Sequence, residues 1–405
     1  MLSRLVPAAG AIALAGVAVC AAAAWPEGST LVPRNAGQPS GEVRWAWIFL
    51  AAEAAAFAAY ALAVLLARRL GTQVAVAATI GVLIQLTPLA APLLLSTDAW
   101  TYWDYGRIAG FEGGNPYRET PSDFPGDPAY PYVGESWRDT TSVYGPAFTL
   151  ASEPIARAAG ASADAAAWIY KTLAALGMVA AAALAARLSR RPALAWLLVG
   201  WNPLLALHFG GGGHNDVWMI VLVLAALALG ASARAQTAGI AWVAAIFVKW
   251  LPLLFLPLRA LEARAQNRRV GHAGFALAAL AAAGLATWRY GLSWLGAIGP
   301  LAQNADRQTS YALPQRLEQL GLPEALTLLL AGAVFLVFYV RLLRQAARGR
   351  ARLGLAACLF LLTTPYLAAW YVVWALPLAA AEDDDVAQWL SLALSAYLLP
   401  QAIPL

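Results

Sequence analysis

Residues 93–117 read LLLSTDAWTYWDYGRIAGFEGGNPY, and this stretch passes abruptly from apolar to polar side chains. Its leucines suit the interior of a lipid bilayer, whereas acidic, basic and aromatic residues follow them. Asp98 stands at the boundary between the two parts. A carboxylate at the end of a membrane span is costly to bury, so the side of the membrane that it faces decides what it can bind.

The composition of the 405-residue chain is that of a membrane protein. Hydrophobic residues make up 61% and charged residues 12%, roughly half the charged fraction of soluble proteins. Apolar runs long enough to cross a bilayer recur along the chain, which predicts an all-α polytopic membrane protein. The net charge of +5 comes from arginines at the ends of these runs, so it reflects topology, and no nucleic-acid partner is expected.

Arginine clusters orient the predicted spans, because basic residues concentrate in cytoplasmic loops. Arg68 and Arg69 follow the second span, which places the loop 96–145 on the external face. The first span resembles a signal peptide, and we expect it to remain uncleaved. The candidate spans are 5–24, 45–67, 73–95, 164–187, 193–209, 215–231, 271–290, 323–342 and 386–403.

Three further segments fit this alternation of sides only if each of them begins and ends on the same side of the membrane. Segment 145–160 is predicted to be a partial or interfacial helix. Segments 236–259 and 353–381 are predicted to enter the membrane and return, with hinges at VKWLP (248–252) and TTPY (363–366). Half-helices at membrane depth need partners for their freed backbone groups, so the two hinges predict an internal polar cavity.

One large external loop is expected at 96–145, and a second external loop at 291–322. In the first, residues 98–112 predict a helix that lies along the membrane surface, and the Gly and Pro residues after it predict an ordered but irregular segment. The acidic run EDDD (382–385) is interpreted as a solvated turn between helices.

The residue type and position of Asp98 suit two roles. Beside aromatic surface at the membrane boundary, its carboxylate could act as a general base on an acceptor hydroxyl. Because STD precedes a helical stretch, Asp98 could equally serve as a helix N-cap.

Arg107 and Lys249 are candidate phosphate-binding residues, because a cation at membrane depth usually marks function. The alternatives are a salt bridge of Arg107 with Asp104 or Glu112, and snorkelling of Lys249 to the interface. The segment HFGGGGHNDVW (208–218) brings His214, Asn215 and Asp216 to the start of a helix, where they could bind hydroxyls or a phosphate or merely cap the helix.

Cys20 and Cys358 lie inside apolar runs, and the three histidines lack the spacing of metal ligands. We therefore expect neither a disulfide nor a metal site.

A set of motifs, taken together and in order, resembles the bacterial polyprenol-phosphate-mannose-dependent mannosyltransferases, members of the GT-C superfamily of membrane glycosyltransferases. The motifs are D-x-x-x-Y-W-x-Y-G-R…G-G-N-P-Y (98–117), YGP (144–146), WNPL…GGGGHND (201–216), RQTSYALPQRL (307–317) and WYVVWALPL (370–378). The resemblance implies a GT-C-like bundle of about 11–13 membrane helices, some short and broken. It covers residues 73–405, the expected transmembrane catalytic domain, and leaves residues 1–72 as an N-terminal helix pair.

The resemblance also implies an activity. GT-C enzymes transfer a sugar from a polyprenyl-phosphate donor to an external glycan or glycolipid acceptor with inversion, and the donor is a cosubstrate, so no cofactor is expected. The chain would then lie in the bacterial plasma membrane, among membrane lipids, with its site on the external, periplasmic face. Asp98 matches the position of the catalytic base, and Asp104 is the alternative carboxylate. The expected substrate-binding residues are Tyr102, Asp104, Tyr105, Arg107, Asn115, Tyr117, Tyr144, His214, Asn215, Asp216, Lys249 and Arg307.

Two other classes of function were weighed against an enzyme. A transporter or flippase of a lipid-linked sugar would also need broken helices and a polar cavity, but the loop 96–145 has no counterpart in the second half of the chain. A membrane scaffold would leave the clustered external Asp, Arg and Tyr residues without a purpose. The sugar, expected to be mannose, and the linkage are not encoded in residue spacing.

Overall fold

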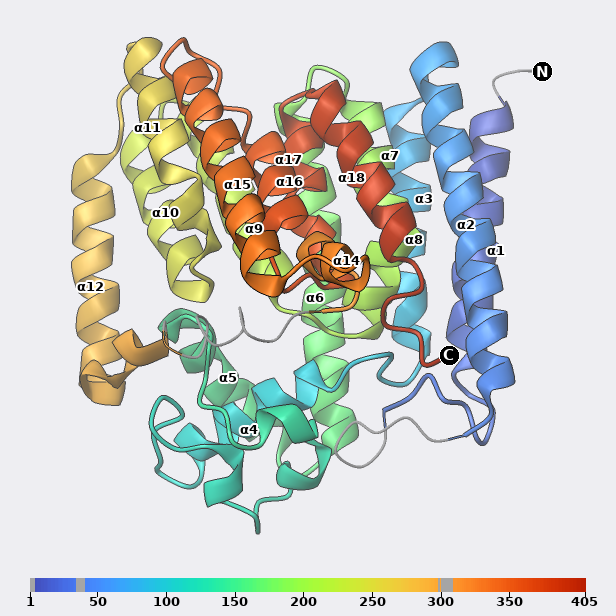
Figure 1. Ribbon diagram of the computed structural model, residues 1–405, viewed down its shortest axis with the longest axis vertical. Coiled ribbons are helices and arrows are strands. Elements are labelled where there is room, and N and C mark those ends of the chain that lie inside the picture. The colour runs from blue at the N-terminus through green and yellow to red at the C-terminus, as the bar shows by residue number, and fades with distance from the viewer. Residues whose placement is uncertain (1–3, 34–40, 298, 300–308) are drawn as a thin grey trace.

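The computed structural model describes residues 4–33, 41–297, 299 and 309–405. In these residues the chain forms a bundle of helices with two distinct ends (Figure 1). We call the end that carries α4 and residues 111–145 the loop side. The opposite end, which carries Arg68, Arg191 and Arg352, is the basic side.

The first two helices form an antiparallel pair at one edge of the bundle (Figure 1). They are α1 (Leu5–Ala23) and α2 (Val43–Leu70). Small residues let them approach closely, because a Cβ on Gly16 would lie 2.8 Å from the Cβ of Ala56. Buried residues of both helices belong to the same hydrophobic core as the rest of the bundle.

Long apolar helices confirm the prediction of a polytopic membrane protein. Five helices of the described residues are long and apolar enough to cross a bilayer: α1, α2, α6 (Ala163–Leu188), the span that begins with α12 (His272–Tyr290), and α15 (Glu324–Ala346). A sixth crossing is bent by 55° between α7 (Pro192–Gly200) and the pair α8 (Pro203–Ala206) and η6 (Leu207–Gly211). Pro203 opens α8 and Asn202 caps it, which explains the break.

Both predicted hinges are confirmed. α10 (Ala235–Val248) ends at Lys249, and the chain returns through η7 (Leu251–Leu254) and α11 (Leu256–Ala265). α16 (Leu353–Thr363) likewise ends before η9 (Ala369–Trp374) and α17 (Leu376–Ala381). Both returns reach the basic side (Figure 1), where Gln266 donates a hydrogen bond to the carbonyl of Gly349 at 2.6 Å.

The remaining helices complete the bundle and the loop side. On the loop side, α5 is confirmed as a short helix of 14 residues, about 21 Å long and too short to cross a bilayer. The other elements are α3 (Val74–Leu86), η2 (Thr87–Ala90), α4 (Asp98–Gly110), η3 (Pro121–Asp123), η4 (Tyr130–Tyr132), η5 (Glu135–Trp137), α5 (Pro146–Ala159), α9 (Asp216–Ala231), η8 (Gly291–Ala297), α14 (Leu313–Gln319) and α18 (Asp385–Leu398).

The helix predicted over residues 98–112 forms as α4, but protein covers it on all sides. Residues 99–109 are all buried, apart from the ends of the helix. α4 packs directly on α5 at Gly106, where a Cβ would lie 2.4 Å from the carbonyl oxygen of Ser152. The aromatic residues that suggested a membrane-surface helix therefore serve to bury α4 within the loop side of the protein.

The acidic turn 382–385 differs from the solvated turn expected of it. Asp383 accepts hydrogen bonds from Arg190 and Arg191, and Asp384 binds Arg352 through two of them. The side chains of Asp383 and Asp384 are only 6% and 2% exposed. The expectation is wrong for these two residues, because arginines that lie far away in the sequence neutralise them.

Candidate active site

Asp98 is the first residue of α4 and does not cap it. The N-cap is Thr97, whose side chain makes no capping hydrogen bond, and the backbone N–H of Asp98 donates to Ser96 Oγ at 3.1 Å. The N-cap interpretation is therefore wrong for Asp98. Its carboxylate is left available for other contacts, with 18% of the side chain exposed.

Two side chains from different elements bind the Asp98 carboxylate. Tyr102, one turn further along α4, donates to Oδ2 at 3.2 Å, and His214 Nδ1 lies 3.0 Å from the same atom. Burial raises the pKa of Asp98, but the hydrogen bond and charge of His214 outweigh it and hold the pKa below its ordinary value. Asp98 is thus ionised at neutral pH and able to accept a proton.

The glycine-rich turn before α9 positions His214. Gly213 adopts a φ of +73°, and a Cβ there would lie 3.3 Å from the Cβ of Ala99, so the turn packs tightly against the start of α4. The His214 ring is fully buried and stacks on the indole of Trp370, with centroids 3.7 Å apart and planes 12° apart. This packing fixes the orientation of the ring, so that Nδ1 faces Asp98.

Asp216 and Lys249 form a second charged pair beside Asp98. Lys249 Nζ donates to Asp216 Oδ1 at 2.5 Å, and the indole N–H of Trp374 donates to the same oxygen at 2.6 Å. Lys249 lies at the hinge that ends α10, and its ammonium also sits 5.1 Å from the ring centre of Tyr371. The lysine is therefore held inside the protein and does not snorkel to the membrane interface.

These charged groups face a small cavity of about 40 Å³. Burial and the charge of Asp98 raise the pKa of Tyr102 and Tyr144, so both phenols stay protonated and can donate hydrogen bonds. The lining residues are Asp98, Tyr102, Trp137, Val143, Tyr144, Asp216, Lys249, Tyr366, Trp370 and Tyr371.

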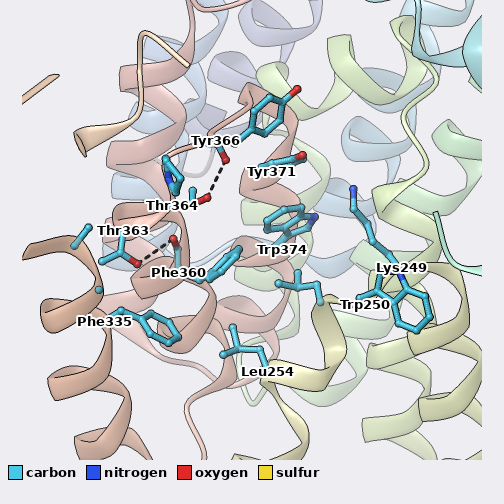
Figure 2. Close-up of a pocket in the computed structure, with 14 residues that line it drawn as sticks. Lys249, Trp250, Leu254, Phe335, Phe360, Thr363, Thr364, Tyr366, Tyr371 and Trp374 are labelled. Carbon is cyan, nitrogen blue, oxygen red and sulfur yellow. Dashed lines mark hydrogen bonds between the residues drawn. The ribbon is translucent and has the colours of Figure 1, made fainter. Parts of the chain in front are cut away.

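A larger apolar cavity of about 570 Å³ adjoins the small one. The two share Lys249, Tyr366 and Tyr371. Figure 2 shows Lys249 and Trp250 on one side of the larger cavity and Phe335, Phe360 and Thr363 on the other. A cation and two phenols thus stand where an apolar space meets a polar one, an arrangement suited to a molecule with a hydrocarbon tail and an anionic head.

Asp104 and Arg107 lie on α4 but do not line this cavity. Arg107 donates to both carboxylate oxygens of Asp127, at 2.7 and 2.9 Å, and not to Asp104 or Glu112. Asp104 is completely buried, and burial, with the nearby charge of Asp127, raises its pKa to about 8. Arg107 therefore joins α4 to the loop through Asp127, whereas both carboxylate oxygens of Asp104 are buried without a hydrogen-bond partner among the described residues.

Three further predicted residues connect the loop to neighbouring elements. The Tyr105 hydroxyl donates to the carbonyl of Thr140 at 2.7 Å, and Tyr117 donates to the carbonyl of Tyr144 at 3.0 Å. Asn115 Nδ2 donates to the carbonyl of Tyr290, at the end of α12, at 2.7 Å. These bonds hold residues 111–145 in place over the cavity. Tyr105, Asn115 and Tyr117 do not themselves line it.

Asn215 and Arg307 complete the predicted set. Asn215 is the N-cap residue of α9 and is 1% exposed, and neither polar atom of its amide has a hydrogen-bond partner within the described residues. Arg307 lies outside the described residues.

The structure also adds residues that sequence reasoning had not assigned to the site. Tyr366, Trp370 and Tyr371 come from the second hinge and contribute half of the aromatic residues that line the small cavity. Trp374, from the same segment, reaches the site through its hydrogen bond to Asp216. The aromatic run after a predicted break in a membrane helix was the available signal. Lys171 is a further buried cation on α6, and it donates to the carbonyls of Ala91 and Pro92 in the segment that leads to Asp98.

Known proteins are similar in sequence to parts of this chain. A family model described as alpha-(1->6)-mannopyranosyltransferase, N-terminal domain, matches residues 4–264. Alpha-(1->6)-mannopyranosyltransferase A of Corynebacterium glutamicum is 28% identical over 253 residues, which are 56% of this chain and 50% of that protein. A protein of the same name from Mycobacterium tuberculosis is 31% identical over 169 residues, 39% of this chain and 32% of that protein.

A probable alpha-(1->6)-mannopyranosyltransferase of Mycolicibacterium smegmatis is 32% identical over 143 residues, 34% of this chain and 25% of that protein. The matches thus span half the length or less of these relatives. No solved structure matches the chain. The family match covers more than half of the chain and includes Asp98, His214, Asp216 and Lys249. The chain therefore belongs to the alpha-(1->6)-mannopyranosyltransferase family, as the mannosyltransferase resemblance of its motifs predicts.

Proposed function

We propose that the protein is an integral membrane glycosyltransferase that moves a mannosyl group from a polyprenyl-phosphate donor to an external glycan or glycolipid acceptor. The observation that carries the proposal is the place where the two cavities meet. There an ionised carboxylate, Asp98, shares a small polar space with Lys249, and an apolar space of about 570 Å³ opens from the same lysine. The names of the relatives support mannose as the sugar.

The larger cavity suits the prenyl tail of the donor. Its wall is mostly apolar and aromatic, with Leu254, Phe335 and Phe360 among its members (Figure 2). The phosphate would then lie at Lys249, the cation at the mouth of that cavity. Lys249 donates one hydrogen bond to Asp216, and an ammonium has three N–H groups, so it retains donors for a phosphate oxygen.

The proposed reaction is a single displacement at the anomeric carbon. Asp98 takes the proton of the acceptor hydroxyl, and the acceptor oxygen forms a bond to the anomeric carbon. At the same time the bond from that carbon to the phosphate oxygen breaks, and its electron pair leaves with the polyprenyl phosphate next to Lys249. Inversion in one displacement turns a β-linked donor into an α-linked product, the linkage in the names of the relatives.

Asp98 and Lys249 would contribute to different parts of the barrier. General base catalysis by a positioned carboxylate accelerates proton transfer by about 10²–10⁴-fold. A fixed ammonium beside the departing phosphate stabilises the charge that develops there, in a site with little water. Asp216 holds Lys249 in place, because its Oδ1 accepts hydrogen bonds from both Lys249 and Trp374.

The small cavity must widen to admit a sugar ring. Its volume of about 40 Å³ holds little more than one water molecule. Trp137, Val143 and Tyr144 close it from the external loop. We therefore place the sugar under residues 137–144, and entry of the donor and acceptor requires this part of the loop to move outward.

The side of the membrane follows from the arginines. The end opposite the loop carries Arg68, Arg191 and Arg352, among others, and basic loops lie in the cytoplasm. The site and the loop 96–145 would then face the outside of a bacterial plasma membrane.

The direct test is sugar transfer by the purified protein in lipid nanodiscs, with polyprenyl-phosphate-mannose as donor and a short mannoside as acceptor. Asp98→Asn is expected to lower kcat by at least about a hundredfold with donor binding retained. Asp104→Asn is the matched control, since it makes the same change on the same helix outside the cavity. Equal loss in both variants, or full activity of Asp98→Asn, would remove Asp98 from the mechanism.

A further inference from the structure

A second large apolar cavity, of about 650 Å³, lies away from the charged site, between α14, α15, α16 and α18. It adjoins the donor cavity at Ala331 and Thr363, which line both. The mechanism above uses none of its other residues.

The charged residues of this cavity, Arg341 and Arg352, lie at one end of it together with Gln345. Arg341 and Gln345 come from the last turns of α15, and Arg352 is the N-cap residue of α16. This end belongs to the basic side of the protein, where α15 ends (Figure 1). Leucine, valine and phenylalanine line most of the remainder. The cavity is therefore amphipathic along its length, with its cationic end at one membrane surface.

The two arginines at that end differ in their partners. Arg352 binds Asp384 through two hydrogen bonds, of 2.6 and 2.8 Å, so its charge is compensated. Arg341 has no carboxylate within salt-bridge distance in the part of the chain that the structure describes. Its guanidinium lies over the ring of Phe338, 5.0 Å from the centroid. Arg341 is exposed, so it can reach a lipid headgroup at the rim of the cavity, and its charge favours an anionic headgroup over an uncharged one.

The cavity is long enough to hold a phospholipid. The lining stretch of α15 from Thr327 to Gln345 rises about 27 Å at 1.5 Å per residue. The hydrocarbon of one leaflet is about 15 Å thick, so the acyl chains of a lipid whose phosphate lies at Arg341 and Gln345 would occupy the half of the cavity next to the basic side. α15 is also poorly covered by protein, since only 11% of its spanning window is buried, so lipid can reach the cavity from the side.

From these observations we propose that the cavity binds one anionic phospholipid of the leaflet on the basic side. Its phosphate pairs with Arg341 and Gln345, and its acyl chains lie between α15 and α16. Because the cavity shares Ala331 and Thr363 with the donor cavity, an acyl chain forms part of the wall against which a prenyl tail would pack. The binding itself does not depend on the proposed transfer activity.

The test is lipid retention by the purified full chain. The protein is stripped of lipid in detergent and mixed with phosphatidylglycerol or phosphatidylcholine of identical acyl chains, and bound lipid is counted by native mass spectrometry. The native chain is expected to hold one phosphatidylglycerol about tenfold more tightly than phosphatidylcholine. Arg341→Gln should bind the two lipids with nearly equal affinity. Arg344→Gln removes the same charge from the same helix outside the cavity and should leave the preference intact.

A second variant tests the apolar part. Val334→Trp places a large ring in the cavity and should abolish retention of both lipids, while size-exclusion chromatography reports whether the variant remains folded. Equal binding of the two lipids by the native chain would overturn the proposal. So would an equal effect of Arg341→Gln and Arg344→Gln, which would indicate diffuse attraction to basic residues. Displacement of the phospholipid by polyprenyl phosphate, one for one at this cavity, would assign it to the donor instead.

Discussion

Asp98 keeps its negative charge in surroundings that would ordinarily neutralise a carboxylate. Burial alone raises its pKa, and the hydrogen bond and charge of His214, together with Ser96 and Lys249, bring it below the ordinary value. His214 is itself fully buried and does not line the cavity, so it cannot reach a sugar or phosphate there. We therefore assign His214 to positioning and ionising Asp98, whereas the sequence had suggested a substrate contact.

Loss of His214 should change the pH dependence of transfer as well as its rate. In His214→Asn the interaction that lowers the pKa of Asp98 is weakened, so the pKa rises. A base works only when ionised, so the acidic limb of the kcat/KM profile should move to higher pH, and kcat at neutral pH should fall about tenfold or more. His208→Asn is the control, since His208 packs against the His214 ring without a hydrogen bond to Asp98. An unchanged acidic limb in His214→Asn would contradict the assignment.

The Asp216–Lys249 pair can be separated into its structural and chemical parts. Lys249→Met leaves the Asp216 carboxylate buried without its cation, at a cost of about 3–5 kcal/mol in the free energy of unfolding. The double variant Lys249→Met/Asp216→Asn removes both charges and should recover most of the thermal stability. It should not recover transfer, because the phosphate still lacks its cation. Recovery of activity along with stability would make Lys249 a purely structural residue.

The two hinges are the elements that create the site. Lys249 stands where α10 stops, and Trp370, Tyr371 and Trp374 follow the point where α16 stops. A continuous helix would bury these side chains between neighbouring helices or expose them to lipid. Because each helix breaks and returns, the freed segments face each other, and the space between them becomes the two cavities.

The loop approaches the first hinge closely at Gly145. Gly145 donates its backbone N–H to the carbonyl of Val248 at 3.1 Å, next to Lys249. A Cβ at this position would lie 2.1 Å from the carbonyl oxygen of Phe247, so no larger residue fits without displacing the hinge. The YGP motif thus fixes the distance between the loop and the lysine.

Gly145→Ala should therefore reduce transfer although it changes no polar side chain. We expect the displaced hinge to raise the KM for the donor and to lower the melting temperature of the protein. Gly126→Ala is the matched control, because a Cβ at Gly126 in the same loop meets nothing within 4 Å. The prediction fails if both variants behave alike in the transfer assay and in thermal unfolding.

At the scale of the whole molecule, the two ends of the bundle carry different clusters of charged residues. The loop side holds the Asp98 site, and on the basic side Asp383, Asp384 and Asp385 bind arginines from α2, from the segment between α6 and α7, and from the start of α16. This network ties the N-terminal helix pair and the last helices to the rest of the bundle. It does so at the membrane surface opposite the site.

Transfer should also proceed without a metal ion. No group of three or more His, Cys, Asp or Glu side chains suited to a metal was found where the chain is described, and Lys249 supplies a positive charge beside the proposed phosphate. We expect the rate to stay unchanged after dialysis against EDTA and on addition of magnesium or manganese. A loss restored by one of these ions would show that a metal, and not the lysine alone, balances the phosphate charge.

Much of the fold was predictable from the sequence, because membrane insertion depends on local properties of the chain. Hydropathy predicted six of the nine spans at the length of the described crossings, whereas the spans predicted at 73–95, 215–231 and 386–403 form shorter helices. The conflict between the apolar runs and the orientation set by the arginines located the hinges at 248–252 and 363–366. Asp98, Asp216 and Lys249 could be named as candidates for a related reason. A charge at the end or in the middle of an apolar run is costly enough to stand out without any knowledge of its partners.

Only the tertiary structure decided which of these residues meet. Asp98 and His214 are 116 residues apart, and Asp216 and Trp374 are 158 apart, so helix packing alone brings them together. The same packing pairs Arg107 with Asp127, and it pairs the acidic turn 382–385 with distant arginines. Periodicity and composition report which face of a helix is apolar. They carry no information on the neighbour across that face, and the charge state and role of each candidate depend on that neighbour.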